Sequence, residues 1–505
     1  MADHRTSFTG LMSAPAGAGN PASPLEVLPT RSFVVSPADS AAFADLSGDF
    51  NPLHLDPIVA RRLLFGSTVA HGVHVLMAGL DAILTGCHVT LRLSALRVIF
   101  LGPPIHGEPL AASCSQQPNG VLSLTIRQSG VALQSITATF LDADGSSDLA
   151  VPDRPVPRRQ PLDLVLADAG ERSGGVELAL DRKLAHALLP ALARCLPASQ
   201  LAVLLASTRI VGMECPGLRS IYADLALTLA PPPAAGETHL AFRTLRADRR
   251  MSLIRLGIDG AGASGEITAL FRPDPVAQPQ AAALMQHVVA GEFAGQRALV
   301  IGGSRGLGET TAKLLAMGGA EVAITFARGQ DDALRVAQDI VSRGGSCGCF
   351  QFDVTGPPAE LEGRDLPDGF SPTHVYFFAT PPIQLVKGRS FSDVRFRQYC
   401  DCYVGGLTRS LAAIDRLFAV NEAPLALLYP STIFLDDMRT DAVEYIAAKA
   451  AGEAVCRLLA RARKGLRVAC PRLPVLRTDQ TNSLRGAGRG ADPVPVLLNV
   501  LRDIR

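Results

Sequence analysis

The chain has 505 residues, of which 48% are hydrophobic and 19% are charged. At roughly 100 to 200 residues per domain, this length gives room for two to four domains and excludes a single small module. The 48 Lys and Arg residues balance 47 Asp and Glu residues, so the net charge of +1 provides no field that would attract nucleic acid or an anionic membrane. Composition therefore predicts a globular, soluble protein with no nucleic acid and no membrane among its partners.

Ten cysteines are spread along the chain without the density of a disulfide-rich secreted domain. One residue separates Cys347 from Cys349, and one separates Cys400 from Cys402. This is not the usual spacing of zinc ligands, and the apolar neighbours favour buried thiols, so we assign no metal. Residues 1–30 lack the apolar segment of a signal peptide, and no run of about 18 apolar residues follows. We expect a cytoplasmic protein with a disordered N-terminus over residues 1–30.

Two proline-rich stretches divide the chain. The stretch 151–161 is rich in Pro and charge, cannot continue a helix or a strand, and predicts a linker over 151–171. A second break follows the prolines at 273 and 275 and predicts a linker over 276–294. The predicted domains are residues 31–150, 172–275 and 295–505.

The first two segments show the same order of elements, helix before strands. In the first segment the pattern predicts helical residues at 41–45 and 69–85, followed by strands at 91–101, 121–128 and 131–141. In the second it predicts one long helix at 182–207 and strands at 221–230, 239–246, 252–258 and 265–271. The second segment is therefore predicted to be a diverged α+β repeat of the first. After residue 297, strands alternate with helices, which predicts an α/β doubly wound parallel (Rossmann) sheet.

A polar turn in the first segment carries a carboxylate and an imidazole. Residues 47–56, Ser-Gly-Asp-Phe-Asn-Pro-Leu-His-Leu-Asp, place Asp49 and His54 five residues apart. If the two groups converge on one water, one accepts its proton while the other orients or protonates. A helix that begins near Gly72 presents N–H groups that would polarise a thioester carbonyl. Taken as generic residues, Asp49 and His54 would instead be turn and capping groups.

The run just described, with Ala70-His71-Gly72 at the expected distance, closely resembles the MaoC-like R-specific enoyl hydratases over about residues 33–142. The resemblance implies a hot-dog fold. It also implies that Asp49 and His54 are the catalytic pair and that the backbone amide of Gly72 is the oxyanion donor. His71 is then a structural part of the turn.

The middle segment contains no second turn of this kind. Its strongest local feature, 211–217, includes a Glu and a Cys, and we interpret it as a helix-to-strand turn fixed by Pro216 and Gly217 rather than as a site of chemistry. A hot-dog sheet wraps one helix and usually pairs with another hot dog. The resemblance therefore implies that 172–275 is a degenerate second hot-dog domain, which completes a double hot dog and binds the acyl chain.

A glycine-rich loop opens the last segment. A strand at 297–301 leads into the loop, a helix follows, and a second strand is expected at 321–326. A glycine loop alone is a tight turn, but this order is the context of a nucleotide site, where the backbone approaches a pyrophosphate at a helix N-terminus. The predicted cofactor residues in the loop are Gly302, Ser304, Arg305, Gly306, Leu307 and Gly308.

Charges beside this loop bear on which nicotinamide cofactor binds. Arg328 follows the second strand, where an acidic residue would bind the ribose hydroxyls of NAD. Together with Arg305 it would neutralise a 2′-phosphate, so NADPH is favoured over NADH, although both arginines also suit a solvated surface. Asp353 ends a third expected strand and would hydrogen-bond the adenine.

Further along, Tyr445 and Lys449 lie four residues apart on one helix face, so that the ammonium would lower the pKa of the phenol and make it a proton donor. Ser431 and Thr432 follow an expected strand. With the glycine loop, these residues resemble the short-chain dehydrogenase/reductase family over about 295–480. The resemblance implies that Ser431 or Thr432 binds the substrate carbonyl, Tyr445 protonates it and Lys449 also holds the ribose.

Three departures from that family's pattern fall around the expected cofactor. The family's Asn-Ala-Gly is Phe-Ala-Thr at 378–380, its catalytic-helix Asn is replaced near 402–403, and its Pro-Gly is Pro-Val at 474–475. A branched side chain in place of the glycine narrows the nicotinamide site. These changes leave Tyr445 and Lys449 in place, so we expect an active reductase.

The two predicted sites catalyse adjacent steps. A reductase makes the 3-hydroxyacyl thioester that a hydratase-type site dehydrates, and fusion raises the local concentration of this intermediate. We interpret the chain as an NADPH-dependent 3-oxoacyl reductase and R-3-hydroxyacyl dehydratase of fatty-acid-like or polyketide-like biosynthesis. It would act on acyl-CoA or acyl carrier protein thioesters as a homo-oligomer. The same sites run backwards resemble the peroxisomal multifunctional enzymes of β-oxidation, and a non-catalytic acyl or nucleotide scaffold is the remaining alternative.

Overall fold

A computed structural model describes residues 29–117, 120–143, 148–231, 238–356, 366–367, 369–385, 391–418, 423–484 and 490–505. The predicted disordered segment, 1–30, lies outside these residues except for Pro29 and Thr30. The first compact unit extends to Pro273, apart from the short segment Arg62–Gly66, which belongs with Asp274–Arg505 to the second unit. Among the described residues, no helix is both long and apolar enough to cross a membrane.

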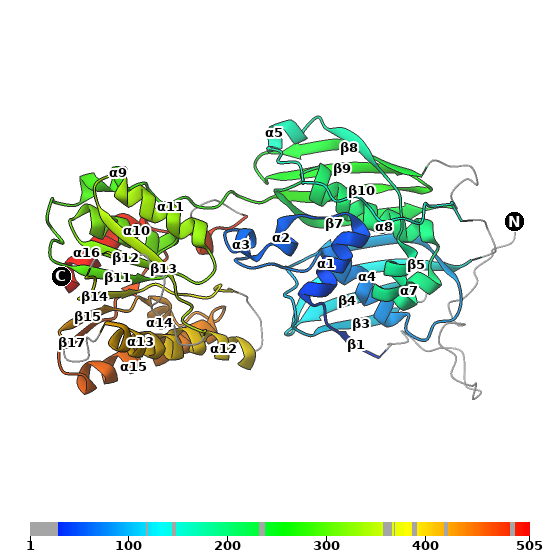
Figure 1. The fold of residues 1–505 in the computed structure, drawn as a ribbon. Helices are drawn as coiled ribbons and strands as arrows, with labels where there is room; N and C mark the ends of the chain where they lie inside the picture. The colour runs from blue at the N-terminus through cyan, green and yellow to red at the C-terminus, as the bar shows by residue number, and fades with distance from the viewer. Residues whose placement is uncertain are drawn as a thin grey trace, which may run out of the picture. The chain divides into compact units, whose positions relative to one another are not determined.

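One antiparallel sheet of ten strands forms the first unit (Figure 1). Its order is β1-β3-β4-β5-β2-β7-β10-β9-β8-β6, so the strands of the first segment lie on one side of the β2–β7 pair and those of the second segment on the other, in mirrored sequence. The strands are β1 (Arg31–Phe33), β2 (Leu91–Phe100), β3 (Leu110–Gln116), β4 (Val121–Gln128), β5 (Val131–Asp142), β6 (Ser173–Glu177), β7 (Ser220–Leu229), β8 (His239–Asp248), β9 (Leu253–Gly260) and β10 (Ala263–Phe271).

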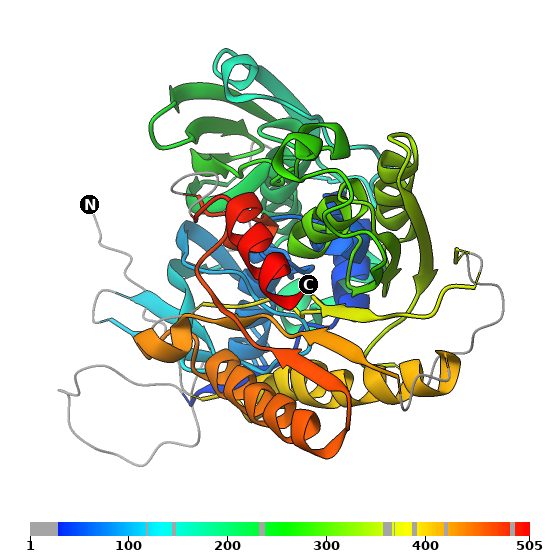
Figure 2. The same cartoon turned by 90° about the vertical axis from the view of Figure 1, so that its left-hand side faces the viewer.

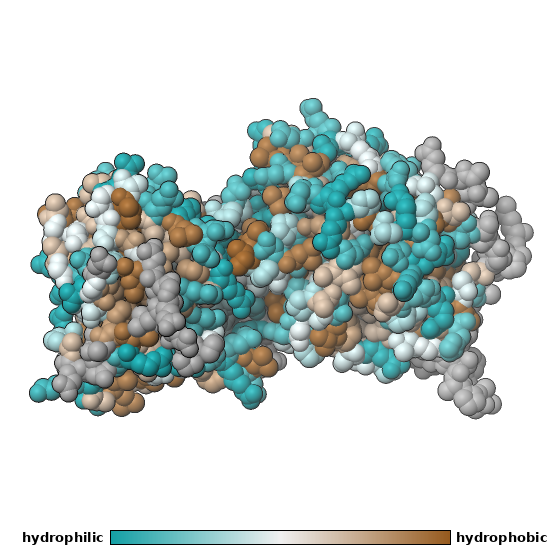
Figure 3. Space-filling model, in the orientation of Figure 1, coloured by the Kyte–Doolittle hydropathy of each residue, from teal (hydrophilic) through white to brown (hydrophobic). Residues whose placement is uncertain are grey.

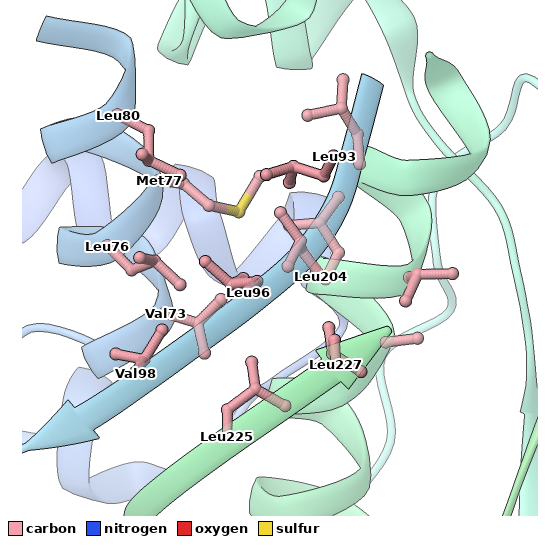
Figure 4. Close-up of a cluster of buried hydrophobic side chains, with 14 of the residues drawn as sticks. Val73, Leu76, Met77, Leu80, Leu93, Leu96, Val98, Leu204, Leu225 and Leu227 are labelled. Atoms are coloured by element: carbon pink, nitrogen blue, oxygen red, sulfur yellow. The ribbon is translucent and has the colours of Figure 1, made fainter. Parts of the chain in front are cut away.

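Two apolar helices, α4 (Gly72–Ile83) and α8 (Ala198–Arg209), pack in the core of this unit. The buried residues of α4 include the unbroken run Val73–Met77, so the helix is enclosed on nearly all sides. Figure 4 shows its apolar side chains meeting side chains from both halves of the sheet and from α8. The residues in contact there are Val73, Leu76, Met77 and Leu80 of α4, Leu93, Leu96 and Val98 of β2, Leu204 of α8, and Leu225 and Leu227 of β7.

The single helix predicted for 182–207 is wrong. The structure has three helices there, α6 (Arg182–Leu188), α7 (Pro190–Cys195) and α8. Pro190 is the first residue of α7 and Pro197 directly precedes α8. Proline has no N–H to donate and its ring clashes with the preceding turn, so each one starts a helix instead of continuing one. Helix α8 runs on into a π-helical turn, η2 (Ile210–Glu214).

The second unit is a parallel six-stranded sheet in the order β13-β12-β11-β14-β15-β17, as the sequence pattern predicts. Helices cover both faces: α10, α11 and α16 pack on one and α12, α13 and α15 on the other (Figures 1 and 2). The strands are β11 (Arg297–Ile301), β12 (Glu321–Phe326), β13 (Ser346–Gln351), β14 (His374–Phe377), β15 (Leu425–Leu428) and β17 (Leu466–Ala469). The helices are α10 (Gly306–Met317), α11 (Gln330–Val341), α12 (Asp393–Cys400), α13 (Leu407–Phe418), α15 (Val443–Ala462) and α16 (Pro493–Ile504).

Shorter elements complete both units. A two-stranded parallel pair, β16 (Ser431–Thr432) with β18 (Arg472–Leu473), extends past the carboxyl end of the main parallel sheet. The remaining helices are α1 (Pro37–Ser47), α2 (Pro52–Leu55), α3 (Pro57–Ala60), α5 (Leu166–Ala169), α9 (Ala281–Leu284), α14 (Phe434–Asp437) and the 3-10 turns η3 (Met285–His287) and η5 (Asp479–Thr481).

The thiols and the surface add no obvious partner. None of the ten cysteines, all of which lie among the described residues, forms a disulfide bond. On the face drawn in Figure 3, hydrophobic and hydrophilic residues alternate in small patches. The exposed large apolar side chains come from many separate elements, for example Leu101, Val289 and Leu458. The oligomeric state therefore stays a prediction.

Candidate active sites

The turn that carries Asp49 and His54 is shaped by the residues between them. Helix α1 ends at Gly48, whose φ of 77° is in the left-handed region that favours glycine. Asn51 then caps α2, because its side chain accepts a hydrogen bond from the Leu53 N–H at 3.1 Å. His54 follows on α2, so one helix end and one helix start bring the two functional side chains to the same place.

Asp49 and His54 are brought together, as predicted. Asp49 is 2% exposed, and its carboxylate accepts from the Thr208 hydroxyl at 2.7 Å. The Nδ1 of His54 lies 2.8 Å from the Val69 carbonyl oxygen. A carbonyl can only accept, so Nδ1 carries the proton and the Nε2 of the neutral ring is left with a lone pair. The site therefore offers a buried carboxylate beside an imidazole whose base nitrogen is fixed.

Burial moves the two pKa values towards each other. It raises the pKa of Asp49, against the lowering effect of the His54 charge and of the hydrogen bond from Thr208. Burial also lowers the pKa of His54, against the raising effect of the Asp49 charge. Groups with converging proton affinities exchange a proton at small cost. This is the electrostatic arrangement that acid–base work on one water requires.

His71 and Gly72 form the start of α4 beside this pair. The His71 Nε2 donates to the Asp49 carbonyl oxygen at 3.0 Å, and its ring stacks on that of His54 with 3.8 Å between centroids. Burial holds the pKa of His71 well below its usual value, with a further contribution from the charge of His54. Gly72 is the first helical residue, so its N–H has no partner within the helix. A Cβ on Gly72 would lie 2.8 Å from the Phe100 ring, which explains the glycine.

Asp49, His54 and His71 also form the one group in the described part of the chain whose possible metal-ligating atoms all lie within 4.8 Å of one another. His54 Nδ1 and His71 Nε2 already donate to carbonyl oxygens, and Asp49 accepts from Thr208. These hydrogen bonds engage one nitrogen of each ring and one oxygen of the carboxylate, and the assignment of no metal stays a prediction.

The catalytic turn is tied to the middle segment, a contact that the sequence analysis missed. The side-chain amide of Asn51 donates to the carbonyl oxygens of Gly212, Gly217 and Leu218 at 3.1 to 3.3 Å. A Cβ on Gly212 would lie 2.1 Å from an Asp49 carboxylate oxygen. The region predicted as a simple turn is therefore a wall of the site. No signal within the segment reveals this, because the partners are about 160 residues away in sequence.

The glycine loop of the second unit has the geometry that a pyrophosphate needs. Gly302 and Gly306 have φ values of 80° and 58°, in the left-handed region. A Cβ on Gly302 would lie 2.9 Å from the Ala379 nitrogen, and one on Gly308 would lie 2.3 Å from the Gly302 oxygen. Helix α10 starts at Gly306, with Ser304 buried before it and Leu307 half-buried in its first turn. The predicted residues thus form a tightly packed backbone turn at the start of α10, in which a side chain at Gly302 or Gly308 would collide with neighbouring backbone.

The groups predicted to set cofactor preference lie in different surroundings. Arg305 lies 3.7 Å from the Asp479 carboxylate, whereas Arg328 is exposed just after β12. Asp353 lies two residues beyond β13 instead of ending it, and accepts from the backbone N–H and the hydroxyl of Thr355 at 2.9 and 2.7 Å. Arg328 is therefore the arginine of the two that faces solvent.

The two hydroxyl candidates have different partners. A hydrogen bond between Thr432 and Tyr445 lowers the pKa of the phenol. Ser431 instead donates to the Glu453 carboxylate at 2.6 Å, and Glu453 is paired with Arg472 at 2.9 Å. The structure brings Thr432, and not Ser431, to the tyrosine.

Lys449 lies against aromatic rings. Its Nζ donates to the Pro430 carbonyl oxygen at 2.8 Å and lies 3.9 Å from the Tyr403 ring centroid. Burial lowers the pKa of Lys449 to about 8 and raises that of Tyr445 to about 12. The expectation that Lys449 lowers the phenol pKa is therefore wrong for this structure, because burial outweighs the opposing interactions around Tyr445.

Two of the departures from the reductase pattern meet in space. The Tyr403 hydroxyl lies 2.5 Å from the Thr380 hydroxyl, and Tyr403 is fully buried in a π-helical turn, η4 (Asp401–Gly406). Its ring faces the Lys449 ammonium. Near the position where the reductase family has an Asn side chain, this chain therefore places the Tyr403 ring against the Lys449 ammonium.

Comparisons with known proteins identify both ends of the chain. Residues 22–128 match the MaoC-like domain, and residues 296–362 match the short chain dehydrogenase domain. A 3-oxoacyl (acyl-carrier-protein) reductase from Agrobacterium tumefaciens with NADP bound is 17% identical, covering 42% of this chain and 88% of that one, with a TM-score of 0.36. FolM alternative dihydrofolate reductase 1 from Brucella suis, in complex with NADP, is 19% identical over the same shares, with a TM-score of 0.34.

Two curated relatives match parts of the chain. The peroxisomal hydratase-dehydrogenase-epimerase of Saccharomyces cerevisiae is 38% identical over 66 residues, which are 13% of this chain and 7% of that protein. The (R)-specific enoyl-CoA hydratase of Aeromonas caviae is 35% identical over 105 residues, 19% of this chain and 77% of that protein. The chain therefore belongs to the MaoC-like R-specific enoyl hydratases through its N-terminal domain, which is fused to an oxidoreductase domain of the short-chain dehydrogenase family.

Proposed function

We propose that Asp49 and His54 hydrate 2-enoyl thioesters and, in reverse, dehydrate R-3-hydroxyacyl thioesters. The observation that carries the proposal is the buried carboxylate beside an imidazole with a fixed base nitrogen. In hydration, a water held by the pair loses a proton as its oxygen bonds to C3, and the pair returns a proton to C2. In dehydration the same groups take the C2 proton and protonate the leaving hydroxyl.

The backbone N–H of Gly72 is the proposed donor to the thioester oxygen. Negative charge develops on that oxygen as the bond to C3 forms or breaks, and a helix N-terminus stabilises such charge. The position of Gly72 at the start of α4, next to His71 and hence to the catalytic pair, supports this role.

We propose that the second unit reduces 3-oxoacyl thioesters with a nicotinamide cofactor. The backbone turn of Gly302, Gly306 and Gly308 would hold its pyrophosphate at the start of α10. When bound, the cofactor supplies a hydride for C3. Tyr445 donates a proton to the carbonyl oxygen, and Thr432 orients the phenol. Ser431 is engaged with Glu453, so Thr432 is the better candidate for the substrate hydroxyl contact.

NADPH is the proposed cofactor and NADH the alternative. The exposed guanidinium of Arg328, just after the second strand, would attract a 2′-phosphate, and a carboxylate there would repel it. Arg305 contributes less to this preference, because its charge is already opposed by Asp479. Asp353 is retained as the proposed adenine contact.

The proposed direction is reductive, in biosynthesis of a fatty-acid-like or polyketide-like chain. One observation favours the oxidative alternative, in which the same sites act as an enoyl-CoA hydratase and an R-3-hydroxyacyl-CoA dehydrogenase: a relative that matches 66 residues of the chain is a peroxisomal hydratase-dehydrogenase-epimerase. The name of the other relative supports coenzyme A as the carrier, with acyl carrier protein as the alternative.

We also propose that the middle segment is a degenerate second hot-dog domain. The mirrored strand order about the β2–β7 pair and the packing of α8 beside α4 support this interpretation. The domain boundaries predicted from the sequence, the acyl-chain role of this segment and a homo-oligomeric assembly remain proposals of the same kind.

One assay tests both activities. The full chain is incubated with 2-enoyl thioesters of short, medium and long chains, and separately with 3-oxoacyl thioesters and NADPH or NADH, on coenzyme A and on acyl carrier protein. Loss of enoyl absorbance reports hydration, and loss of reduced-nicotinamide absorbance reports reduction. We expect both. If neither thioester is turned over on either carrier, the chain is a binding scaffold and the proposal is wrong.

A further inference from the structure

The Asp49 carboxylate accepts a hydrogen bond from a hydroxyl of the middle segment, the segment that has no Asp and His pair of its own. Thr208, in the last turn of α8, donates to a carboxylate oxygen of Asp49 at 2.7 Å. Thr208 is 4% exposed and Asp49 is 2% exposed, so water does not compete for this bond. An ionised carboxylate only accepts hydrogen bonds, so the threonine is the donor.

The position of the carboxylate is fixed from other sides as well. The Asn51 N–H donates to its second oxygen at 3.2 Å. Gly212 leaves the carboxylate no spare room, since a Cβ there would lie 2.1 Å from it. The Asn51 amide, bonded to three carbonyl oxygens of the middle segment, holds the turn in register with α8 and η2.

We propose that Thr208 is a positioning residue of the hydratase reaction: its hydroxyl orients the Asp49 carboxylate and sets the proton affinity of that group. The inference rests on the proposed function of Asp49 and His54 and adds a role for the middle segment. A hydroxyl that donates to a carboxylate stabilises its charged form, so removing the hydroxyl favours the protonated form. The titration of Asp49 then moves to higher pH.

The other titratable groups around Asp49 and His54 come from both the first and the middle segment. His54 on α2 acts on the carboxylate through its charge, and His71 at the start of α4 donates to the Asp49 backbone oxygen. Arg272, which follows β10, lowers the pKa of His54. None of these contacts passes through Thr208, so a change at Thr208 alone leaves them in place.

The test compares Thr208→Val, which keeps the shape and removes the donor, with Thr208→Ser, which keeps the donor. The readout is kcat/KM for hydration of a 2-enoyl-CoA against pH. For Thr208→Val we expect the acidic limb to move up by about one pH unit and kcat/KM at neutral pH to fall by about 10-fold. Thr208→Ser should restore the wild-type profile. If Thr208 had only a structural role, Thr208→Val would lower kcat/KM at every pH and leave the acidic limb of the pH profile in place.

Ser207→Ala is the matched control. Ser207 is the buried neighbour of Thr208 on α8, and its hydroxyl donates to the Leu204 carbonyl oxygen at 2.7 Å. The variant removes a buried hydroxyl from the same helix turn without touching Asp49, so the acidic limb should stay where it is. An equal shift in Ser207→Ala and Thr208→Val would overturn the proposal.

A second measurement does not depend on turnover. The infrared carbonyl band of a protonated carboxyl, taken as the difference between each protein and its Asp49→Asn version, reports the titration of Asp49 directly. We expect a midpoint about one pH unit higher in Thr208→Val than in the wild type. Equal midpoints in the two proteins would overturn the role of Thr208. The proposed function would still hold in that case, provided that the wild type hydrates the enoyl thioester. Absence of hydration in the wild type would instead remove the proposed function.

Discussion

The two acid–base sites of the chain both bury their titratable groups, but they offset the cost of burial in different ways. In the N-terminal site, the charge of Asp49 raises the pKa of His54 and the charge of His54 lowers that of Asp49, so each group partly opposes the effect of burial on the other. In the C-terminal site, Lys449 is surrounded by one carbonyl oxygen and the faces of Tyr403 and Tyr429. Aromatic faces and a neutral carbonyl stabilise an ammonium less than a carboxylate does.

This difference shows what a catalytic group needs from its surroundings. A buried charge keeps its proton affinity near a useful value when an opposite charge lies close to it. Asp49 and His54 satisfy that condition between themselves. The charge of Glu453 also raises the pKa of Lys449, but burial has the larger effect, so that this pKa falls to about 8 while that of Tyr445 rises to about 12. The two sites should therefore respond differently to substitution and to pH.

The largest effect is expected in the N-terminal site. Asp49→Asn and His54→Ala should each lower hydration of 2-enoyl thioesters by about 100-fold or more, because each removes a proton-transfer group. Reduction of 3-oxoacyl thioesters should survive in both. Asp45→Asn and His186→Ala, which change a half-buried Asp and an exposed His outside the site, serve as controls and should hydrate normally. Wild-type hydration by either active-site variant would refute the assignment of the pair.

The second prediction concerns the proton donor of the other site. Tyr445→Phe keeps the ring packing against Tyr403 and Tyr399 but removes the acid, so reduction should fall by at least about 100-fold with little change in NADPH binding. Steady-state kinetics and a separate cofactor titration measure the two quantities.

Tyr376→Phe is the control for that substitution. Tyr376 is a buried tyrosine on β14, and its hydroxyl donates to the Gln296 side chain at 3.0 Å, away from Tyr445. The variant should reduce thioesters at close to the wild-type rate. If the wild type binds NADPH but reduces no 3-oxoacyl thioester, and Tyr445→Phe is silent, the second unit is a nucleotide-binding scaffold.

Local patterns in the sequence are sufficient to predict the catalytic turn and the glycine loop. Gly48, Asn51 and Gly302 act within a few residues of themselves, through a helix end, a cap and a tight turn. The contact of Thr208 with Asp49 is not predictable in this way, because 159 residues separate the partners. In the first unit, the strands β1, β3 and β6 are also missed, since they are short or rich in small polar residues such as those of Leu110–Gln116.

The surroundings of Lys449 show the same limit. Helical spacing correctly places Tyr445 and Lys449 on one helix, α15. It says nothing of the two rings that desolvate the ammonium, because Tyr403 lies in η4 and Tyr429 directly follows β15, and both fold against the helix from elsewhere in the chain. A pKa therefore follows from tertiary packing, and the spacing argument alone gives the wrong direction for Tyr445.

The third prediction uses this desolvation. The pKa of Lys449 is lowered from 10.5 to about 8 by burial. Between these values the unfolded chain binds a proton that the folded chain has lost, so the free energy of unfolding rises with pH across this window and the full cost is present below pH 8. That cost is about 3 kcal/mol. Lys449→Met should therefore raise the Tm at pH 7 and flatten its rise between pH 8 and 10.5.

Lys313→Met is the contrasting control. The Lys313 ammonium is buried but lies 2.8 Å from both the Glu309 and the Asp339 carboxylates. Removing it takes a cation from both carboxylates and leaves Glu309 with Arg335 at 3.2 Å, so this variant should lower the Tm at pH 7. Thermal unfolding from pH 7 to 10.5 measures both variants. A lower Tm for Lys449→Met at pH 7 would show that the aromatic faces offset burial after all.

The smallest effect is expected at Arg328, because its guanidinium is exposed and water screens its charge. Arg328→Asp replaces a cation that attracts a 2′-phosphate with a carboxylate that repels it and can bind ribose hydroxyls. We expect the ratio of kcat/KM for NADPH to that for NADH to fall by about 10-fold. High salt should remove this change in the ratio, because it screens the charge at position 328. Arg343→Asp makes the same charge change two residues beyond the other end of α11 and should leave the ratio unchanged.

If both variants change the ratio equally, the preference comes from the overall field of the unit and Arg328 has no specific role. If neither variant changes the ratio, the preference between NADPH and NADH is set at Arg305 or elsewhere, and Arg328 is an ordinary solvated surface residue.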